Sequence, residues 1–210
     1  AINANAQFVV DVKSTGLFVT DPVLQKQGAN TVYWKTGHSY MKRRTNETGA
    51  LAGFEKSGHF FFNKPYGRGY DDGLVSALAI CDMLDRAPGK SMADLKNALP
   101  KTWSSPTMSP HCADEVKYGV IDQVVKHFED LQAKGARIGG QAIRDLVTVN
   151  GVRVTVEDGS WGLVRASSNK PELVVVVESP VSEQRMHDMF EMVNSVLRTH
   201  PEVGEYNQKI

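Results

Sequence analysis

The chain has 210 residues, enough for one large or two small domains, and 41% of them are hydrophobic, as in proteins that bury a core. Its 24 basic and 24 acidic residues balance, so composition excludes a broad basic field that would recruit nucleic acid or an anionic membrane. The longest aliphatic run, 173–177, is too short to span a bilayer, and the first residues lack the pattern of a signal peptide.

Short buried strands alternate with helices in the first half of the chain. Strands are expected at 7–12, 30–34, 50–54 and 59–63. Helices are expected at 22–28, at 39–48, over 73–86 behind a cap at Asp71 or Asp72, and after a capping box formed by Ser91 and Asp94. Apolar residues of the segment 73–86 recur on one helical face, which predicts burial of Leu74, Ala77, Leu78, Cys81 and Leu84. This order predicts an α/β domain with a mixed sheet and helices.

The segment PKTWSSPTMSP, 100–110, is rich in proline and serine and is interpreted as a linker. The pattern changes after it. A long amphipathic helix at about 121–134 precedes β-rich segments at 145–158, 161–167 and 172–179, and a last helix is expected at 182–199. Asn150-Gly151 and Asp158-Gly159 are hairpin signals between alternating strands. Two helices and a small antiparallel sheet predict an α+β domain. The expected domains are therefore 1–103 and 111–210.

A polar turn separates two of the predicted strands in the first domain. Within GALAGFEKSGHFFF, Glu55 and Ser57 point the same way if the turn is extended. A carboxylate can accept hydrogen bonds from vicinal hydroxyls such as those of a sugar, and Gly58 lets a ligand approach the backbone closely. The residues alone leave an ordinary surface hairpin about equally open.

Two further segments carry groups suited to anions. In WGLVRASSNKPE, a strand leads into Arg165, two serines and Asn169, which together match the demands of a phosphate group. A serine-rich turn with a solvated arginine is the alternative, and composition favours it. Elsewhere, WKTGHS places His38 near the start of a helix, and Lys13 follows a strand where ligands gather in α/β sheets.

Taken in order, the motifs DVK, WKTGHS, ETGALAGFEKSGHFFF, YDDG and RASSNKP resemble the C-terminal half of the α-D-phosphohexomutases, in the phosphomannomutase/phosphoglucomutase branch. The resemblance covers nearly the whole chain. It implies the third and fourth domains of a four-domain enzyme, the fourth being a TATA-binding-protein-like antiparallel sheet with two helices.

The resemblance assigns a role to the polar turn. The sugar-recognition loop of the family, Gly-Glu-Met-Ser-Gly-His, falls on residues 54–59. Glu55 and Ser57 then bind sugar hydroxyls, and His59 aligns with the family's histidine. Phe54 replaces the family's glycine and Lys56 replaces its methionine, a position that varies with sugar preference. The sequence therefore does not decide between glucose phosphate and mannose phosphate as the substrate.

The phosphate loop of the family, Arg-Ala-Ser-Asn-Thr, falls on residues 165–169. Arg165 and Ser167 match it, whereas Ser168 and Asn169 stand in place of Asn and Thr and keep hydrogen-bonding side chains. The resemblance implies that these four residues bind the phosphate that is not transferred. It also implies that Lys13, His38 and His59 face the reacting centre, with the two histidines as candidate proton shuttles.

The segments that carry chemistry in the family are not found in this sequence. Its phosphorylated serine lies in the first domain and its magnesium loop in the second, so the resemblance implies that Mg²⁺ is bound by domains outside this chain. Cys81 and Cys112 have no CxxC spacing, which predicts buried free thiols in a reducing cytoplasm rather than a metal site.

The resemblance therefore implies the substrate-recognition half of an isomerase. In the whole enzyme, phosphate would pass from phosphoserine to a hexose 6- or 1-phosphate through a hexose 1,6-bisphosphate. The expected partners are hexose phosphates and the N-terminal domains of the same enzyme, without nucleic acid or membrane, and this half alone is expected to be inactive. The alternative is a freestanding, non-catalytic sugar-phosphate-binding protein.

Overall fold

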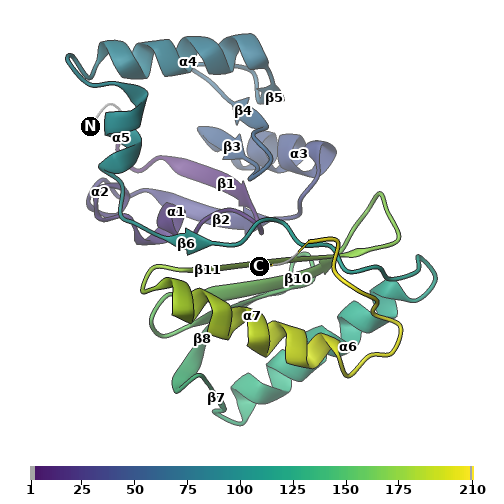
Figure 1. The fold of residues 1–210 in the computed structure, drawn as a ribbon. Helices are drawn as coiled ribbons and strands as arrows, with labels where there is room; N and C mark the ends of the chain where they lie inside the picture. Colours follow the sequence, from purple (N-terminus) through teal and green to yellow (C-terminus); the bar gives the residue numbers. More distant parts are fainter. Residues whose placement is uncertain (1–2, 209) are drawn as a thin grey trace. The chain divides into compact units, whose positions relative to one another are not determined.

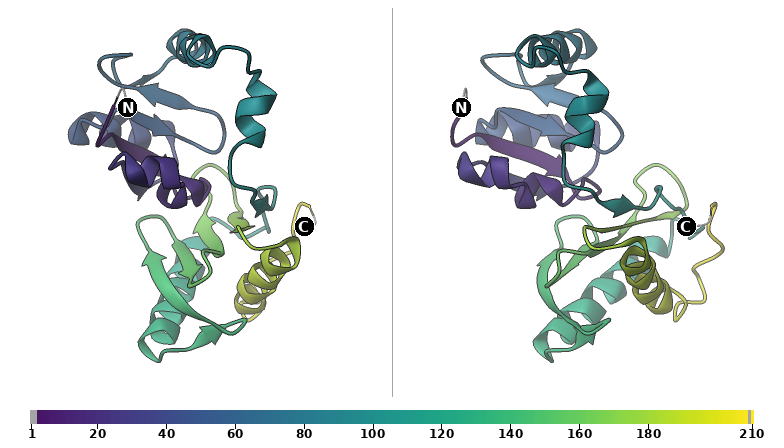
Figure 2. Two further views of the ribbon diagram at one scale, coloured as in Figure 1. Left: turned by 90° about the vertical axis from the view of Figure 1, so that its left-hand side faces the viewer. Right: turned by 60° about the vertical axis from the view of Figure 1, so that its left-hand side comes forward.

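The computed structural model describes residues 3–208 and 210 of the chain. The fold consists of two compact units that divide between Lys101 and Thr102 (Figure 1). Unit 1 precedes this point and unit 2 follows it. Each unit has its own sheet and its own helices, which Figure 2 shows from two further sides.

A mixed five-stranded sheet forms the centre of unit 1, with the strand order β2–β1–β3–β4–β5. Its strands are β1 (Gln7–Asp11), β2 (Asn30–Trp34), β3 (Ala52–Phe54), β4 (Phe60–Phe62) and β5 (Tyr70–Asp71). Strands β2, β1 and β3 are parallel, whereas β4 pairs antiparallel with both β3 and β5. The three parallel strands therefore end at one edge of the sheet, and the predicted α/β class is confirmed.

The two faces of this sheet differ in how they are covered. The helices of unit 1 are α1 (Leu17–Thr20), α2 (Pro22–Lys26), α3 (His38–Thr48), α4 (Gly73–Asp85) and α5 (Met92–Asn97). Helix α3 covers one face, where Met41 packs with Val9 and Phe61 in a buried cluster. Side chains alternate across a strand, so the opposite face carries aromatic rings such as Phe54, which stacks on Phe18 at 5.6 Å between centroids.

Helix α4 differs from the sequence prediction. Asp72 caps it by accepting from the N–H groups of Leu74 and Val75, as the sequence suggests. However, none of the residues of α4, all of which the structure describes, is buried; Leu74 is 72% exposed, and Cys81 is exposed rather than buried. A groove of about 450 Å³ runs between α4 and the aromatic face of the sheet, and it is lined in part by Phe60 and Met83. The α4 residues that line the groove, such as Ile80 and Met83, are not those of the expected apolar face. Leu74, Leu78 and Cys81 of that face are exposed instead of lying in a core.

Unit 2 is an antiparallel sheet in the order β6–β11–β10–β9–β8–β7. Its strands are β6 (Trp103–Ser104), β7 (Arg137–Ile138), β8 (Gln141–Val147), β9 (Val152–Val156), β10 (Trp161–Ala166) and β11 (Leu173–Ser179). Helices α6 (Lys117–Ala133) and α7 (Glu183–Leu197) lie on one face of the sheet (Figures 1 and 2). Their apolar stripes, which include Val124, Phe128 and Met189, meet alternate residues of the strands in the core. This confirms the predicted α+β class.

The expected linker is largely part of this sheet. The N–H groups of Ser105 and Met108 donate to the carbonyls of Val177 and Val175, and Pro110 accepts from Leu173 N–H. The segment 103–110 therefore lies along the outer edge of β11. Its prolines do not conflict with this pairing, because proline is tolerated in edge strands at positions where no N–H donor is needed.

An ion pair joins α7 to the turn between β9 and β10. The Nε atom of Arg185 lies 2.7 Å from Oδ2 of Asp158, and Ser160 N–H donates to Oδ1 at 2.8 Å. Burial raises the pKa of the Asp158 carboxyl, but the hydrogen bonds from Ser160 and Arg185 outweigh burial and hold this pKa below its usual value. Arg185 is buried and also donates to the carbonyl of Ile138. The pair therefore holds α7, the turn and β7 together.

We expect Asp158→Asn to lower the free energy of unfolding by about 2 kcal/mol at neutral pH, because it removes a charge-assisted bond from a buried arginine. The native pKa of Asp158 is depressed, so its contribution is present above the unfolded value of about 3.9 and is lost as pH falls through the native value. The difference between wild type and variant in urea unfolding should therefore begin to shrink below about pH 4 and disappear below the native pKa. The control Asp130→Asn removes an exposed pair with Lys126 and should change little. A difference that persists at pH 2 would contradict this account.

Candidate functional site

Polar residues gather at one edge of the sheet in unit 1. Strands β1, β2 and β3 end there, and the segments that follow them begin at Val12, Lys35 and Glu55. His59 precedes the antiparallel strand β4 and Asp71 ends β5, so both lie at the same edge. Ligands of open α/β sheets bind at the carboxyl ends of the strands. This edge is therefore the candidate site of unit 1.

The carboxylate of Asp11 is the central acceptor of this edge. It is fully buried and accepts from the hydroxyl of Ser14 at 2.7 Å and that of Thr36 at 3.0 Å. The backbone N–H of Lys56 donates to it at 3.2 Å, and the Nζ atom of Lys13 lies 3.5 Å from Oδ2. Asp11 thus connects the three segments that follow the parallel strands, and it holds the ammonium of Lys13 at the edge.

The structure brings Glu55 and Ser57 together. The Ser57 hydroxyl donates to Oε2 of Glu55 at 3.0 Å, and the backbone N–H of Gly37 donates to Oε1 at 3.0 Å. Gly37 has a φ of 131°, a conformation that favours glycine, and it precedes the first turn of α3. Each carboxylate oxygen has a further lone pair, so Glu55 can accept from ligand hydroxyls while its position stays fixed. Glu55 is buried, whereas Ser57 is exposed.

Two histidines share one carboxylate beside this turn. Nδ1 of His59 lies 2.6 Å from Oδ2 of Asp71, and Nε2 of His38 lies 3.8 Å from the same oxygen. Their rings are 6.5 Å apart, and both side chains are about half exposed. Because the carboxylate can only accept, Nδ1 of His59 is the donor, and its Nε2 is left for a ligand proton.

The loop between β10 and β11 holds the residues expected to bind phosphate. Arg165 is buried near the end of β10, and its Nη1 donates to the carbonyl of Ala166 at 2.8 Å. Ser167 is buried and its N–H donates to the carbonyl of Glu172 at 2.9 Å, which closes the loop. Ser168 and Asn169 are exposed at its tip. The loop therefore presents hydroxyl, amide and backbone donors beside a guanidinium.

The residues described here do not form a metal site. Across residues 3–208 and 210, the structure has no cluster of three histidine, cysteine or acidic side chains suited to a metal ion. The oxygens of Asp11 accept from hydroxyl and N–H donors, and Asp71 pairs with His59. The donor set does not fit Mg²⁺, which prefers several free oxygen ligands. Within the same part of the chain, no helix is long and apolar enough to cross a membrane.

Asp11 and Asp71 are the site residues that the sequence analysis missed. Asp11 was treated as part of a strand, although a carboxylate at the end of a buried strand needs donors from its surroundings. Asp71 was interpreted as a possible cap, but Asp72 alone caps α4. Two adjacent acids before one helix leave one of them for another role, and this signal could have identified Asp71.

Comparisons with known proteins give the same family for both units. The family model for phosphoglucomutase/phosphomannomutase alpha/beta/alpha domain III matches residues 1–103, and the model for the C-terminal domain matches residues 112–196. The chain belongs to the phosphoglucomutase/phosphomannomutase family. In it, this chain corresponds to domain III and the C-terminal domain.

Among curated relatives, the phosphomannomutase/phosphoglucomutase of Pseudomonas putida is 34% identical over 203 residues, which are 96% of this chain and 40% of that protein. A phosphoglucomutase of Neisseria meningitidis is 31% identical and covers 91% of this chain and 39% of its own length. The chain therefore spans about 40% of the length of these mutases.

Two solved structures have the same fold. A phosphoglucomutase/phosphomannomutase family protein from Burkholderia thailandensis has a TM-score of 0.73 and 29% identity, over 97% of this chain and 40% of that protein. An N-acetylphosphoglucosamine mutase from Aspergillus fumigatus, solved with GlcNAc-6P and magnesium, has a TM-score of 0.60 and 12% identity, over 93% of this chain and 39% of that protein. At this low identity the second likeness shows the fold alone.

We expect Asp11→Asn to lower the free energy of unfolding of unit 1 by about 1–3 kcal/mol, because the amide nitrogen cannot accept from Thr36 and faces Lys13. Urea unfolding, followed through the indole N–H of Trp34 by NMR, measures the change. Asp85→Asn, at an exposed position near the end of α4, is the matched control. Equal unfolding midpoints for the two variants would show that Asp11 does not hold the edge together.

Proposed function

We propose that this chain is the substrate-recognition half of a phosphohexomutase that interconverts hexose 6-phosphate and hexose 1-phosphate. Unit 1 recognises the sugar hydroxyls and unit 2 binds the phosphate that is not transferred. The observation that carries the proposal is the fixed carboxylate of Glu55, which Gly37 N–H and Ser57 hold at the carboxyl edge of the sheet. A second support is the family membership of both units.

Sugar recognition follows from the acceptors of unit 1. Glu55 accepts from two vicinal hydroxyls through its free lone pairs, and the Ser57 hydroxyl adds a donor or acceptor. Lys13 supplies a positive charge near the reacting phosphate, since its ammonium lies at the same edge. Lys56, which replaces the methionine usual in this loop, is exposed beside Ser57 and bears on the choice between glucose and mannose.

Proton transfer is the role of the histidines. Asp71 holds Nδ1 of His59, so Nε2 takes the proton of the sugar hydroxyl as its oxygen bonds to the phosphorus of the phosphoserine and the bond from that phosphorus to the serine oxygen breaks. Nε2 returns a proton to a sugar oxygen when that oxygen is the leaving group in the transfer back to serine. His38, on the other side of Asp71, is the second candidate shuttle. The phosphoserine and Mg²⁺ of the mutase reaction belong to the part of the enzyme outside this chain, and a hexose 1,6-bisphosphate is the intermediate. The reaction takes place in the cytoplasm.

Phosphate binding is the role of the loop in unit 2. Arg165 contributes a charge-assisted donor, and Ser167, Ser168 and Asn169 contribute hydroxyl and amide groups around it. To bind phosphate, the Arg165 guanidinium exchanges its bond to the Ala166 carbonyl for bonds to phosphate oxygens. Charged acceptors form stronger hydrogen bonds than a neutral carbonyl, so this exchange is favourable.

Binding experiments on the chain test the two roles separately. Glu55→Gln should lower the affinity for glucose 6-phosphate and mannose 6-phosphate about tenfold, because one charged acceptor is lost. The affinity for inorganic phosphate should stay unchanged. Arg165→Ala should lower the affinity for the sugar phosphates and for inorganic phosphate alike. Titrations followed by NMR measure the affinities.

The control for Arg165→Ala is Arg144→Ala, an exposed arginine of strand β8 in the same sheet. It should leave every affinity unchanged. If wild type binds no phosphate ester, or if the Arg165 and Arg144 variants behave alike, the assignment of the phosphate loop is wrong.

A turnover assay tests the division of labour within the enzyme. The chain alone should convert no mannose 1-phosphate to mannose 6-phosphate when Mg²⁺ and mannose 1,6-bisphosphate are supplied, because no histidine here replaces the phosphoserine. Coupled spectrophotometry of released 6-phosphate measures the rate. Sustained turnover by the purified chain, verified by its mass, would show that the chemistry has been assigned to the wrong residues.

A further inference from the structure

A buried lysine contacts the phosphate loop from behind. The Nζ atom of Lys117 lies 2.9 Å from the carbonyl oxygen of Lys170 and 2.6 Å from Oδ1 of Asp114. The Lys117 side chain is only 4% exposed, whereas that of Asp114 is 63% exposed. Lysine is almost never fully buried unless it is paired, so its position requires both contacts.

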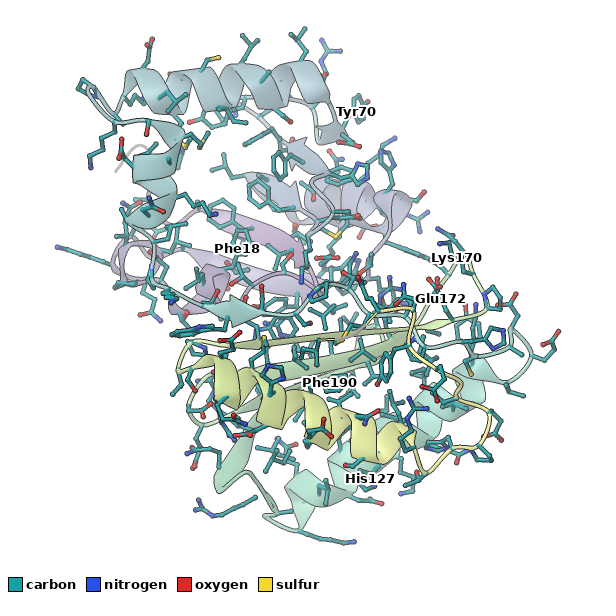
Figure 3. The ribbon with its side chains drawn as sticks, viewed as in Figure 1. Phe18, Tyr70, His127, Lys170, Glu172 and Phe190 are labelled. Carbon is teal, nitrogen blue, oxygen red and sulfur yellow. The ribbon has the colours of Figure 1, made fainter. Side chains whose placement is uncertain are left out.

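The carbonyl that Lys117 contacts belongs to the loop between β10 and β11. Lys170 directly follows Asn169, and Figure 3 labels it together with Glu172 on this loop. The same carbonyl accepts from Glu172 N–H at 2.8 Å, and the Glu172 carbonyl accepts from Ser167 N–H at 2.9 Å. A chain of hydrogen bonds therefore leads from Lys117 to the backbone of Ser167.

At its other end, this series of hydrogen bonds begins in helix α6 of unit 2. Lys117 is the first residue of α6, whose Val120, Val124 and Phe128 are buried in the core. The segment just before α6 also contacts the loop, because Cys112 N–H donates to the carbonyl of Pro171 at 3.0 Å. The position of the loop is thus fixed relative to the core rather than by the loop's own residues alone.

We propose that Lys117 is a positioning residue for phosphate binding. It touches neither phosphate nor sugar; it holds the Lys170 carbonyl so that Ser167, Ser168 and Asn169 present their donors in one arrangement before the ligand arrives. A loop ordered in advance binds more tightly because less conformational entropy is lost on binding. This inference rests on the proposed function of the loop.

We expect unit 2 to stay folded when Lys117 is replaced by methionine. Methionine has a similar length and fills the same buried space. After Lys117→Met, the exposed Asp114 carboxylate is solvated, and the Lys170 carbonyl keeps its bond from Glu172 N–H. No buried charge is left unpaired. A loss of affinity in this variant would therefore report on the loop.

The experiment compares Lys117→Met with Lys126→Met in the 210-residue chain. Lys126 is on the same helix and pairs with Asp130, but its side chain is 74% exposed. We expect Lys117→Met to lower the affinity for inorganic phosphate and glucose 6-phosphate by about fivefold. Lys126→Met should change neither affinity. Lys117→Arg should restore most of the affinity, because guanidinium can donate to both Asp114 and the carbonyl.

Amide hydrogen exchange separates positioning from general stability. Lys117→Met should speed the exchange of the Ser167 and Glu172 amides and leave the core amides of β10 unchanged. Faster exchange throughout unit 2 would overturn the inference, since Lys117 would then be a structural anchor only. The inference fails, while the proposed function stands, if wild type binds phosphate, Arg165→Ala lowers this affinity, and Lys117→Met has the same affinity as Lys126→Met. If wild type binds no phosphate, the proposed function fails with it.

Discussion

The site in unit 1 depends on one buried carboxylate, that of Asp11. A carboxylate removed from water is costly unless donors surround it, and here those donors come from the segments after three different strands. The sheet edge can therefore close around Asp11 only when Ser14, Thr36 and Lys56 N–H converge on it. The same bonds place Lys13 and the Glu55 turn, so this interaction contributes both to the stability of unit 1 and to the geometry of its site.

The groups proposed to contact ligand share a second property. Each is held by a partner within its own unit: Glu55 by Gly37 N–H, His59 by Asp71, and the phosphate loop by Lys117. Such partners fix side chains and backbone before a ligand arrives, which favours binding of one defined shape. Each unit therefore holds its own recognition groups through contacts within that unit.

Local signals predicted much of the fold and the polar turn of the candidate site. Short apolar runs and alternating segments predicted most of the longer strands. The capping box of Ser91 and Asp94 is present as predicted, and the turn with Glu55 and Ser57 lies between two paired strands. The short strands β5, β6 and β7 were not predicted, because two residues carry no periodicity. The role of Asp71 was not predicted, because His59 comes close to it only after β4 and β5 pair. Helical periodicity likewise could not show that α4 lies beside a groove.

The segment 103–110 has a consequence for how unit 2 can be separated from the rest of the chain. It supplies the outer hydrogen-bonding partners of β11, whose core is a run of four valines. A version of unit 2 that began at residue 111 would expose this apolar strand along its whole length. Unpaired edges of this kind recruit strands from other molecules, so the shortened unit would associate edge to edge. Cutting before Thr102 instead keeps β11 covered by its own chain.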